Sequence, residues 1–144
     1  MKATIPLEIV KLDKGSYHLF LTILVDNQPA RVVVDTGASR SVFDKTWIST
    51  FLIREKIKPV NQLSTGLGTN GMESYCVKIS SLGVGNITIK NYTMVLLDLT
   101  HVIQSYENLG RKPPLGVLGS DIFMKFRAVI NYQKKILVLD SGKK

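Results

Sequence analysis

Short apolar runs separated by turn-forming residues dominate the hydrophobic pattern of this chain. The turn candidates between them are Lys14-Gly15, Asn27-Gln28-Pro29, Gly85-Asn86 and Gln133-Lys134. Strand-length runs with tight turns between them are typical of an all-β barrel or sandwich. The runs are Leu7–Leu12, Tyr17–Val25, Ala30–Val34, Ser74–Ile79, Ile87–Ile89, Tyr92–Leu97, Ala128–Tyr132 and Ile136–Leu139.

Helical signals are few and short. Asp44 is a candidate cap for a helix through Leu52, Asp98 or Thr100 for one reaching about Glu107, and Ser120 for one through Phe126. In the middle segment, apolar residues at helical spacing indicate packing first, with a lid over a cleft as the alternative; they are Leu99, Val102, Ile103 and Tyr106. Trp47 is expected in a core or interface cluster with its apolar neighbours, which are Val42, Phe43, Phe51 and Leu52.

Length, composition and charge exclude several classes of protein. A length of 144 residues predicts one domain, and 44% hydrophobic residues can build its core. Nineteen basic and eleven acidic residues give 19 − 11 = +8, but the basic residues are scattered without an aromatic platform, so nucleic-acid binding is not expected. No signal peptide or membrane helix is recognisable, and we expect a cytoplasmic protein with no membrane partner.

Residues that usually carry metal or thiol chemistry are scarce. Cys76 is the one cysteine of the chain, and its alternating neighbours predict a buried thiol on a strand. His18 and His101 lie 83 positions apart without companion ligands, so neither a zinc site nor a histidine-based hydrolase is indicated. We expect no metal and no cofactor.

The segment Ala30 to Ser39 is the most informative for chemistry. The run Val32–Val34 has the composition of a strand buried on both faces, and Asp35-Thr36-Gly37-Ala38 follows it at once. A carboxylic acid at the exit of such a strand is expected to be buried, which favours its neutral form and suits acid-base chemistry. The same three residues also end ordinary strands in an Asx turn, so the segment alone leaves both readings open.

A second segment, some 80 positions later, favours a catalytic role of Asp35 over an ordinary turn. In Leu115 to Phe123, the apolar pair Val117-Leu118 is closed by Gly119 and followed by a capped helix. A glycine there permits one backbone segment to pass close to another. Taken together, the two segments resemble the retropepsin-like aspartic proteases, which include retroviral proteases and the protease domain of the Ddi proteins. The resemblance covers about residues 17–139 of a single domain spanning 1–144, and the Ser120-Asp121-Ile122-Phe123 continuation is more similar to Ddi and bacterial members than to viral ones.

The resemblance implies a fold and an activity. The fold would be an all-β, single-domain closed barrel with one or two short helices, active as a homodimer. Asp35 from each subunit would share a proton across the two-fold axis, and water activated between the two carboxyl groups would attack the peptide bond of an extended polypeptide substrate. Thr36 would tie the two loops together, Gly37 would contact substrate, and Ala38 matches the family. Ser39 departs from the viral aspartate, which puts viral substrate contacts in doubt.

The resemblance also implies a flap, a glycine-rich hairpin that closes over substrate. The segment Leu63 to Ser74 fits that place, and Thr65, Gly66, Leu67 and Gly68 are its candidate substrate-binding residues. Asn70-Gly71 is equally a standard hairpin turn, so an inert surface hairpin remains the alternative.

Two alternatives to this interpretation remain. Asp140-Ser141-Gly142 could complete an intramolecular pair as in two-lobed pepsins, but only two residues follow it, so we interpret it as a terminal turn. In the retroviral relatives the terminal strands interleave to form the dimer interface, and the resemblance implies that Ile136 to Leu139 could contribute to one here. The competing function is a catalytically silent peptide-binding or assembly module with the same fold.

Overall fold

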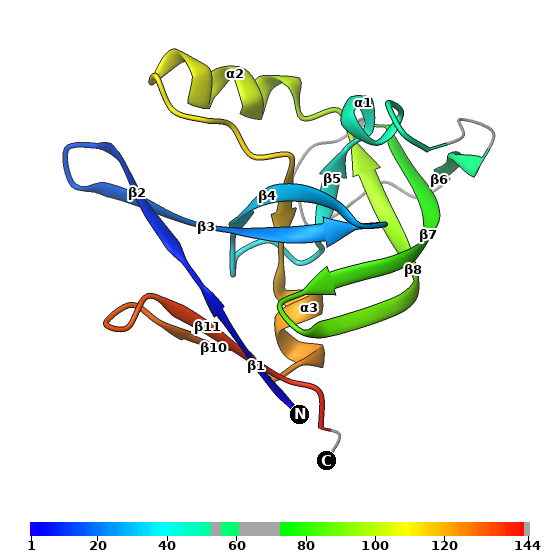
Figure 1. The fold of residues 1–144 in the computed structure, drawn as a ribbon. Coiled ribbons are helices and arrows are strands. Elements are labelled where there is room, and N and C mark those ends of the chain that lie inside the picture. The colour runs from blue at the N-terminus through cyan, green and yellow to red at the C-terminus, as the bar shows by residue number, and fades with distance from the viewer. Residues whose placement is uncertain (53–55, 61–72, 143–144) are drawn as a thin grey trace.

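The strands predicted from the sequence form two mostly antiparallel sheets in the computed structural model (Figure 1). The structure describes residues 1–52, 56–60 and 73–142. The strands are β1 Lys2–Pro6, β2 Glu8–Asp13, β3 Ser16–Val25, β4 Gln28–Val34, β5 Val42–Asp44, β6 Lys58–Val60, β7 Ser74–Val84, β8 Ile87–Leu97, β9 Gly116–Leu118, β10 Val129–Asn131 and β11 Ile136–Asp140. The helices among the described residues are α1 Lys45–Ile48, α2 Thr100–Asn108 and α3 Ser120–Lys125.

Six strands close into a barrel. The larger sheet has the order β2-β3-β4-β9-β5-β8-β7-β6, and an additional pairing of β3 with β7 joins its interior strands into a ring. In that pairing Leu24 lies opposite Gly83 and Val25 opposite Leu82. Closure removes the free edges of the six ring strands and leaves β2 and β6 outside the ring. The fold is therefore a mostly β closed barrel, as predicted, and the described residues form three short helices where one or two were expected.

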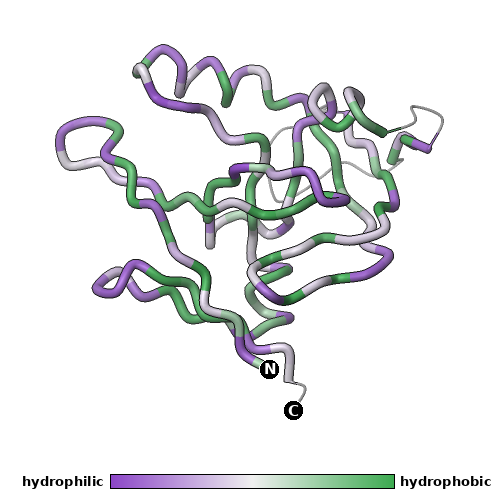
Figure 2. Tube along the Cα trace, viewed as in Figure 1, coloured by the Kyte–Doolittle hydropathy of each residue, from purple (hydrophilic) through white to green (hydrophobic). Residues whose placement is uncertain are grey.

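The core lies inside this ring and under the smaller sheet. Val32 is fully buried, and Val33 and Val34 are each 9% exposed, so β4 is covered on both faces as its composition predicted. Val32 and Val34 face the main core, whereas Val33 packs on the other side with Phe20 and Tyr106. Figure 2 shows hydrophobic residues along the strands and hydrophilic ones at the hairpin turns.

The smaller sheet brings the two ends of the chain together. Its order is β1-β11-β10, with Lys2 opposite Asp140 and Pro6 opposite Ile136. The sequence pattern did not predict β1, whose partner residues on β11 lie 130 to 138 positions away. β11 pairs with β1 along its whole length and with β10 at Ile136 to Val138, so little of its backbone is open to a second copy.

Several predicted elements need adjusted limits. The runs Ile87–Ile89 and Tyr92–Leu97 form one strand, β8, with Asn91 in a left-handed conformation at φ 54° in its middle. The first predicted helix ends earlier, at Ile48, although hydrogen-bonded turns continue to Leu52. Cys76 lies on a strand as predicted but is only partly buried.

The apolar cluster around Trp47 belongs to the core. Phe43 is fully buried, and Trp47, Phe51 and Leu52 pack against the same cluster. The rings of Trp47 and Phe51 meet edge to face with centroids 5.0 Å apart. The prediction that Trp47 packs in an apolar cluster with its neighbours is confirmed.

Candidate active site

Asp35 begins a tight loop at the exit of β4. Its backbone N–H donates to the carbonyl of Leu118 at 3.0 Å, which extends the parallel pairing of β4 with β9 by one residue. Its Oδ1 atom accepts the N–H of Gly37 at 2.9 Å, and the N–H of Ala38 donates to its carbonyl at 3.1 Å. The Asx turn therefore forms, and it orients the carboxyl group while leaving Oδ2 without a hydrogen bond to the described residues.

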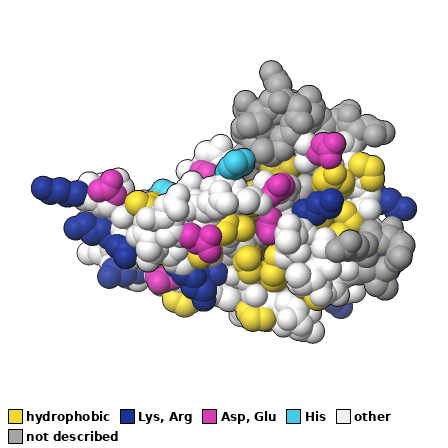
Figure 3. Space-filling model, turned by 90° about the horizontal axis from the view of Figure 1, so that it is seen from above, with side chains coloured by type: hydrophobic (Ala, Val, Ile, Leu, Met, Phe, Trp, Pro, Cys, Tyr) yellow, Lys and Arg dark blue, Asp and Glu magenta, His cyan; other side chains and the backbone are white. Residues whose placement is uncertain are grey.

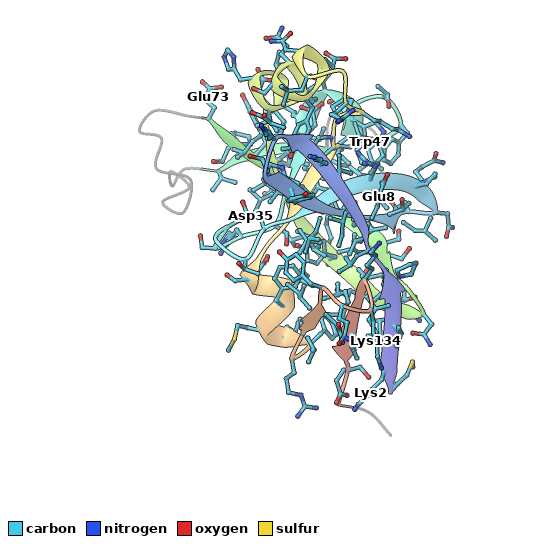
Figure 4. All side chains as sticks on the ribbon, turned by 90° about the vertical axis from the view of Figure 1, so that its left-hand side faces the viewer. Lys2, Glu8, Asp35, Trp47, Glu73 and Lys134 are labelled. Carbon is cyan, nitrogen blue, oxygen red and sulfur yellow. The ribbon has the colours of Figure 1, made fainter. Side chains whose placement is uncertain are left out.

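The expected burial of Asp35 is wrong for the single chain. Asp35, Thr36 and Gly37 are all exposed, and burial resumes only at Ala38, which is 4% exposed. The reason is geometric: the buried part of β4 ends at Val34, and the following loop projects from the end of the barrel. In Figure 4 Asp35 lies on the same side of the molecule as Glu73, away from Lys2 and Lys134.

Ser41 joins the Asp35 loop, residues 35–41, to the segment after β9. Its hydroxyl donates to Oδ1 of Asp121 at 2.8 Å and accepts the N–H of Gly119 at 2.8 Å. The backbone N–H of Ser41 also donates to Asp121 Oδ1, at 2.9 Å. Ser41 is only 1% exposed, so this bridge is shielded from competing water.

Gly119 allows the two segments to touch. A Cβ atom at this position would lie 2.7 Å from the carbonyl oxygen of Ala38 and 2.9 Å from the carbonyl carbon of Arg40, both of them backbone atoms. The N–H of Ser120 donates to that same Ala38 carbonyl at 2.8 Å. The close approach predicted for Gly119 is present in the structure.

Removing the Ser41 hydroxyl should loosen this junction. We expect Ser41→Ala to lower the free energy of unfolding by about 1–3 kcal/mol, because it leaves the buried N–H of Gly119 without its acceptor. Denaturant unfolding measures this loss. Ser39→Ala is the matched control, since the Ser39 hydroxyl is in the same loop but makes no hydrogen bond to the described residues, and we expect a change below about 0.5 kcal/mol. Equal losses in both variants would contradict the bridging role of Ser41.

A cleft of about 580 Å³ opens beside Asp35. Its floor is apolar and is formed by residues of β3, β4, β9 and the end of β8, including Leu19, Val33, Leu97 and Val117. One wall comes from α2, and Tyr17 and Tyr132 stand at its exposed edge. An apolar cleft with few polar groups is the usual form of a binding site for a small ligand or a peptide side chain.

Tyr106 anchors α2 to the barrel at this cleft. Its hydroxyl shares a hydrogen bond with Nδ1 of His18 on β3, and its ring meets that of Phe20 edge to face at a centroid distance of 5.5 Å. Burial raises the pKa of the Tyr106 phenol, the positive charge of Arg31 lowers it, and the carboxylate of Asp35 raises it further. Tyr106 thus stays neutral, and α2 packs against the barrel as predicted while also lining the cleft. The alternative of a lid over the cleft stays a prediction.

The structure brings the two predicted motifs side by side. The pairing of β4 with β9 places the first motif, Asp35 to Ala38, against the second, Val117 to Gly119. The flap candidates Thr65, Gly66, Leu67 and Gly68 lie outside the described residues. β6 and β7, which flank that segment, pair antiparallel with Val60 opposite Ser74. Sequence reasoning missed the roles of Ser41, Asp121 and the His18–Tyr106 pair, since nothing local distinguishes them from surface polar residues.

Asp140 repeats the local geometry of Asp35 without its surroundings. Its Oδ1 atom accepts the N–H of Gly142 at 2.9 Å, and Arg127 lies 3.5 Å from its other oxygen. The hydrogen bond from Gly142, with the charge of Arg127, holds the pKa of Asp140 below its usual range. Asp140 is opposite Lys2 in the smaller sheet, at the other end of the molecule from Asp35 (Figure 4). It does not complete a pair with Asp35.

The described residues hold no group of three or more His, Cys, Asp or Glu side chains suited to a metal ion. None of the helices in the described ranges has the length and apolar character that crossing a membrane requires.

Comparisons with known proteins agree on one family. The sequence profile of a family described as "Aspartyl protease" matches residues 21–122. No curated protein matches the sequence. Among solved structures, a retropepsin-like aspartic protease from Rickettsia conorii aligns over 96% of this chain and 89% of its own, with 20% identity and a TM-score of 0.61.

Two further structures share the fold. The retroviral protease-like domain of Ddi1 from Leishmania major aligns over 85% of this chain and 88% of its own, with 12% identity and a TM-score of 0.57. The EIAV protease complexed with the inhibitor HBY-793 aligns over 74% of this chain and 85% of its own, with 20% identity and a TM-score of 0.51.

Proposed function

Because the chain belongs to the retropepsin-like aspartyl protease family, we propose that it is an aspartic endopeptidase acting on extended polypeptide. The observation that carries this proposal is the Asp35 carboxyl group, oriented by Gly37 at the mouth of an apolar cleft. A cleft bordered by strands suits a substrate in extended conformation, which adds strand-like backbone hydrogen bonds.

One chain supplies one such carboxyl group, and the reaction needs two. We propose a homodimer in which Asp35 of each subunit faces the other across the two-fold axis. The exposure of Asp35, Thr36 and Gly37 in the single chain supports this arrangement, because a second copy placed there would cover all three. Thr36 would then link the two loops, and Gly37 would offer its backbone to the substrate.

The proposed reaction needs neither a metal nor a covalent intermediate. Two carboxyl groups about 3 Å apart share one proton, a property for which aspartic proteases are themselves the standard example. The ionised group accepts a proton from water, which attacks the peptide carbonyl, while the protonated group donates to the carbonyl oxygen. The resulting gem-diol collapses when the amide nitrogen is protonated.

The test is cleavage of a diverse pool of unstructured peptides over a range of protein concentrations and pH values. Specific activity should rise with protein concentration, because the site is assembled from two chains. The rate should fall about tenfold per pH unit on the alkaline side, once the shared proton is lost. A specific activity that does not depend on protein concentration would contradict the shared site. A cleavage rate that stays unchanged into alkaline pH would contradict the paired carboxyl groups. Peptide binding without cleavage would favour a silent binding module.

A further inference from the structure

Basic side chains gather where the cleft beside Asp35 meets solvent. Lys11 and Lys14 lie on the β2–β3 hairpin, Arg111 and Lys112 follow α2, and all four are exposed. Figure 1 shows this hairpin and the end of α2 projecting on the same side of the molecule, and Figure 3 shows Lys and Arg side chains concentrated at that end, on the left. We name these four residues the basic patch.

Hydrogen bonds hold the two parts of the basic patch beside each other. Nε of Arg111 donates to the backbone carbonyl of Lys11 at 2.9 Å, and Nη1 of Arg31 donates to the carbonyl of Lys112 at 2.8 Å. The charge of Arg31 is already paired with Glu8 at 2.8 Å. The other N–H groups of the Arg111 guanidinium make no hydrogen bond to the described residues. A guanidinium fixed in this way presents a preformed fork of donors that matches a carboxylate.

The acids on the same segments do not neutralise the patch. They are Asp13 on the hairpin and Glu107 in the last turn of α2. The Asp13 carboxylate accepts the backbone N–H of Lys14, and none of the four basic side chains forms a salt bridge within the described ranges. Lysine and arginine are positively charged at neutral pH, so the patch attracts anionic groups.

The register of three strands places the patch near Asp35. Asp35 follows Val34, which lies opposite Leu19 on β3, and on the same strand Tyr17 lies opposite Lys11 of β2. Neighbouring strands are about 4.8 Å apart, so the backbone of Lys11 is about 10 Å across the sheet from the end of β4. Residues directly opposite each other point to the same face, so the Lys11 side chain shares the face of Tyr17, which lines the cleft.

On these observations, and resting on the proposed function, we propose that the basic patch binds an acidic segment of the substrate polypeptide, about three to six residues from the cleaved bond. An extended chain covers about 3.4 Å per residue, so three residues span the distance of about 10 Å from Asp35 to Lys11. Continuity with the cleft identifies the occupant as substrate, because a chain that leaves the cleft past Tyr17 meets Lys11 next. Carboxylate side chains there accept charge-assisted hydrogen bonds from Lys11 and Arg111.

The charges inside the cleft keep the acidic residues of the substrate outside it. Asp35 and Asp98 are the carboxyl groups that line the cleft, and no lysine or arginine of the described residues does. The hydroxyl and the backbone N–H of Thr100 donate to Asp98 and hold its pKa below the usual range, so this group is ionised. A substrate carboxylate is therefore repelled beside Asp98 and attracted at the patch.

The test measures binding without turnover. The probe is the unstructured peptide of the pool that the Asp35→Asn protein binds most tightly, extended at one end by a tail of four Glu, four Gln or four Lys residues. Calorimetry at neutral pH and about 50 mM salt should show the Glu tail bound about tenfold more tightly than the Gln tail, and the Lys tail more weakly than both. At about 500 mM salt the ratio of Glu to Gln affinity should fall to within about twofold, because salt screens exposed charges.

The variants locate the binding groups. Lys11→Gln, an exposed change that leaves the hydrogen bond to the backbone carbonyl in place, should lower the Glu-to-Gln ratio about threefold. Lys11→Gln combined with Arg111→Gln should lower it to within about twofold. The matched control combines Lys78→Gln with Lys90→Gln. It removes two exposed charges from β7 and β8 without touching the lining of the cleft, and should retain at least about half of the ratio.

A Glu-to-Gln ratio near one at low salt, or an equal loss in the control variant, would overturn the inference. A single-stranded RNA that displaces the Glu-tailed peptide and binds more tightly would also overturn it, because the patch would then serve nucleic acid.

Failure of the proposed function gives a different result. If the wild-type protein cleaves no peptide while the Glu preference in binding depends on Lys11 and Arg111, the acidic-segment site stands and the catalytic assignment fails. If cleavage occurs, the Glu tail should lower KM and leave kcat unchanged, because the patch contacts the substrate equally before and during the reaction. Cleavage with no tail preference would leave the protease assignment intact and end the inference.

Discussion

Replacing Asp35 with asparagine is expected to abolish peptide cleavage, with a loss of at least about 10³-fold in kcat/KM. Asparagine cannot accept the proton of the attacking water, and removing an acid-base group of this kind typically costs about 10²–10⁴-fold. In a homodimer one substitution removes both carboxyl groups, so the loss should lie at the upper end. Steady-state cleavage of the best peptide from the pool, at the pH of maximum rate, measures it.

The same variant should fold normally. The Oδ1 atom of asparagine can still accept the N–H of Gly37, and the side chain is exposed, so we expect a change below about 0.5 kcal/mol in the free energy of unfolding. Asp140→Asn is the matched control, because Asp140 has the same turn geometry far from the cleft and should retain cleavage. Cleavage by pure Asp35→Asn protein would end the catalytic assignment of this residue.

Gly119→Ala is expected to be the most damaging substitution to the architecture around Asp35. The added methyl group would meet two backbone atoms of the Asp35 loop at 2.7 and 2.9 Å, and backbone cannot rotate away as a flexible side chain can. We expect a loss of about 3 kcal/mol in the free energy of unfolding. A displacement of the loop by about 1 Å would also lower kcat/KM by about 10²-fold.

Gly83→Ala provides the comparison for this effect. A Cβ atom on Gly83 in β7 would lie 3.4 Å from Cβ of Leu24, an ordinary contact distance. That variant should change the free energy of unfolding by no more than about 1 kcal/mol and keep full activity. Denaturant unfolding measures the change in the free energy of unfolding of both variants, and steady-state kinetics measures their kcat/KM. If Gly119→Ala behaved like Gly83→Ala, the close packing of the two motifs would not be needed to hold Asp35.

The sequence alone determined the features that local pattern controls. The alternation of apolar residues in β3 and the unbroken valine run of β4 follow from burial on one face or two, and both were predicted close to their observed bounds. The Asp35-Thr36-Gly37 turn and the close approach at Gly119 were also predicted from local residues. The turn forms because a carboxylate accepts a hydrogen bond from a backbone N–H two residues later. The close approach requires only that Gly119 lacks a Cβ atom and that another backbone segment passes nearby.

Only the tertiary structure decided what depends on distant partners. Closure of the barrel through β3 and β7, and the pairing of β1 with β11, join segments that carry no mark of one another in the sequence. The bridge from Ser41 to Gly119 and Asp121 and the hydrogen bond between His18 and Tyr106 span about 80 positions. The exposure of Asp35 also depends on distant parts of the chain. The composition of β4 shows that the strand is buried, but where the barrel ends, and thus whether the next residue meets water, is set by all the strands together.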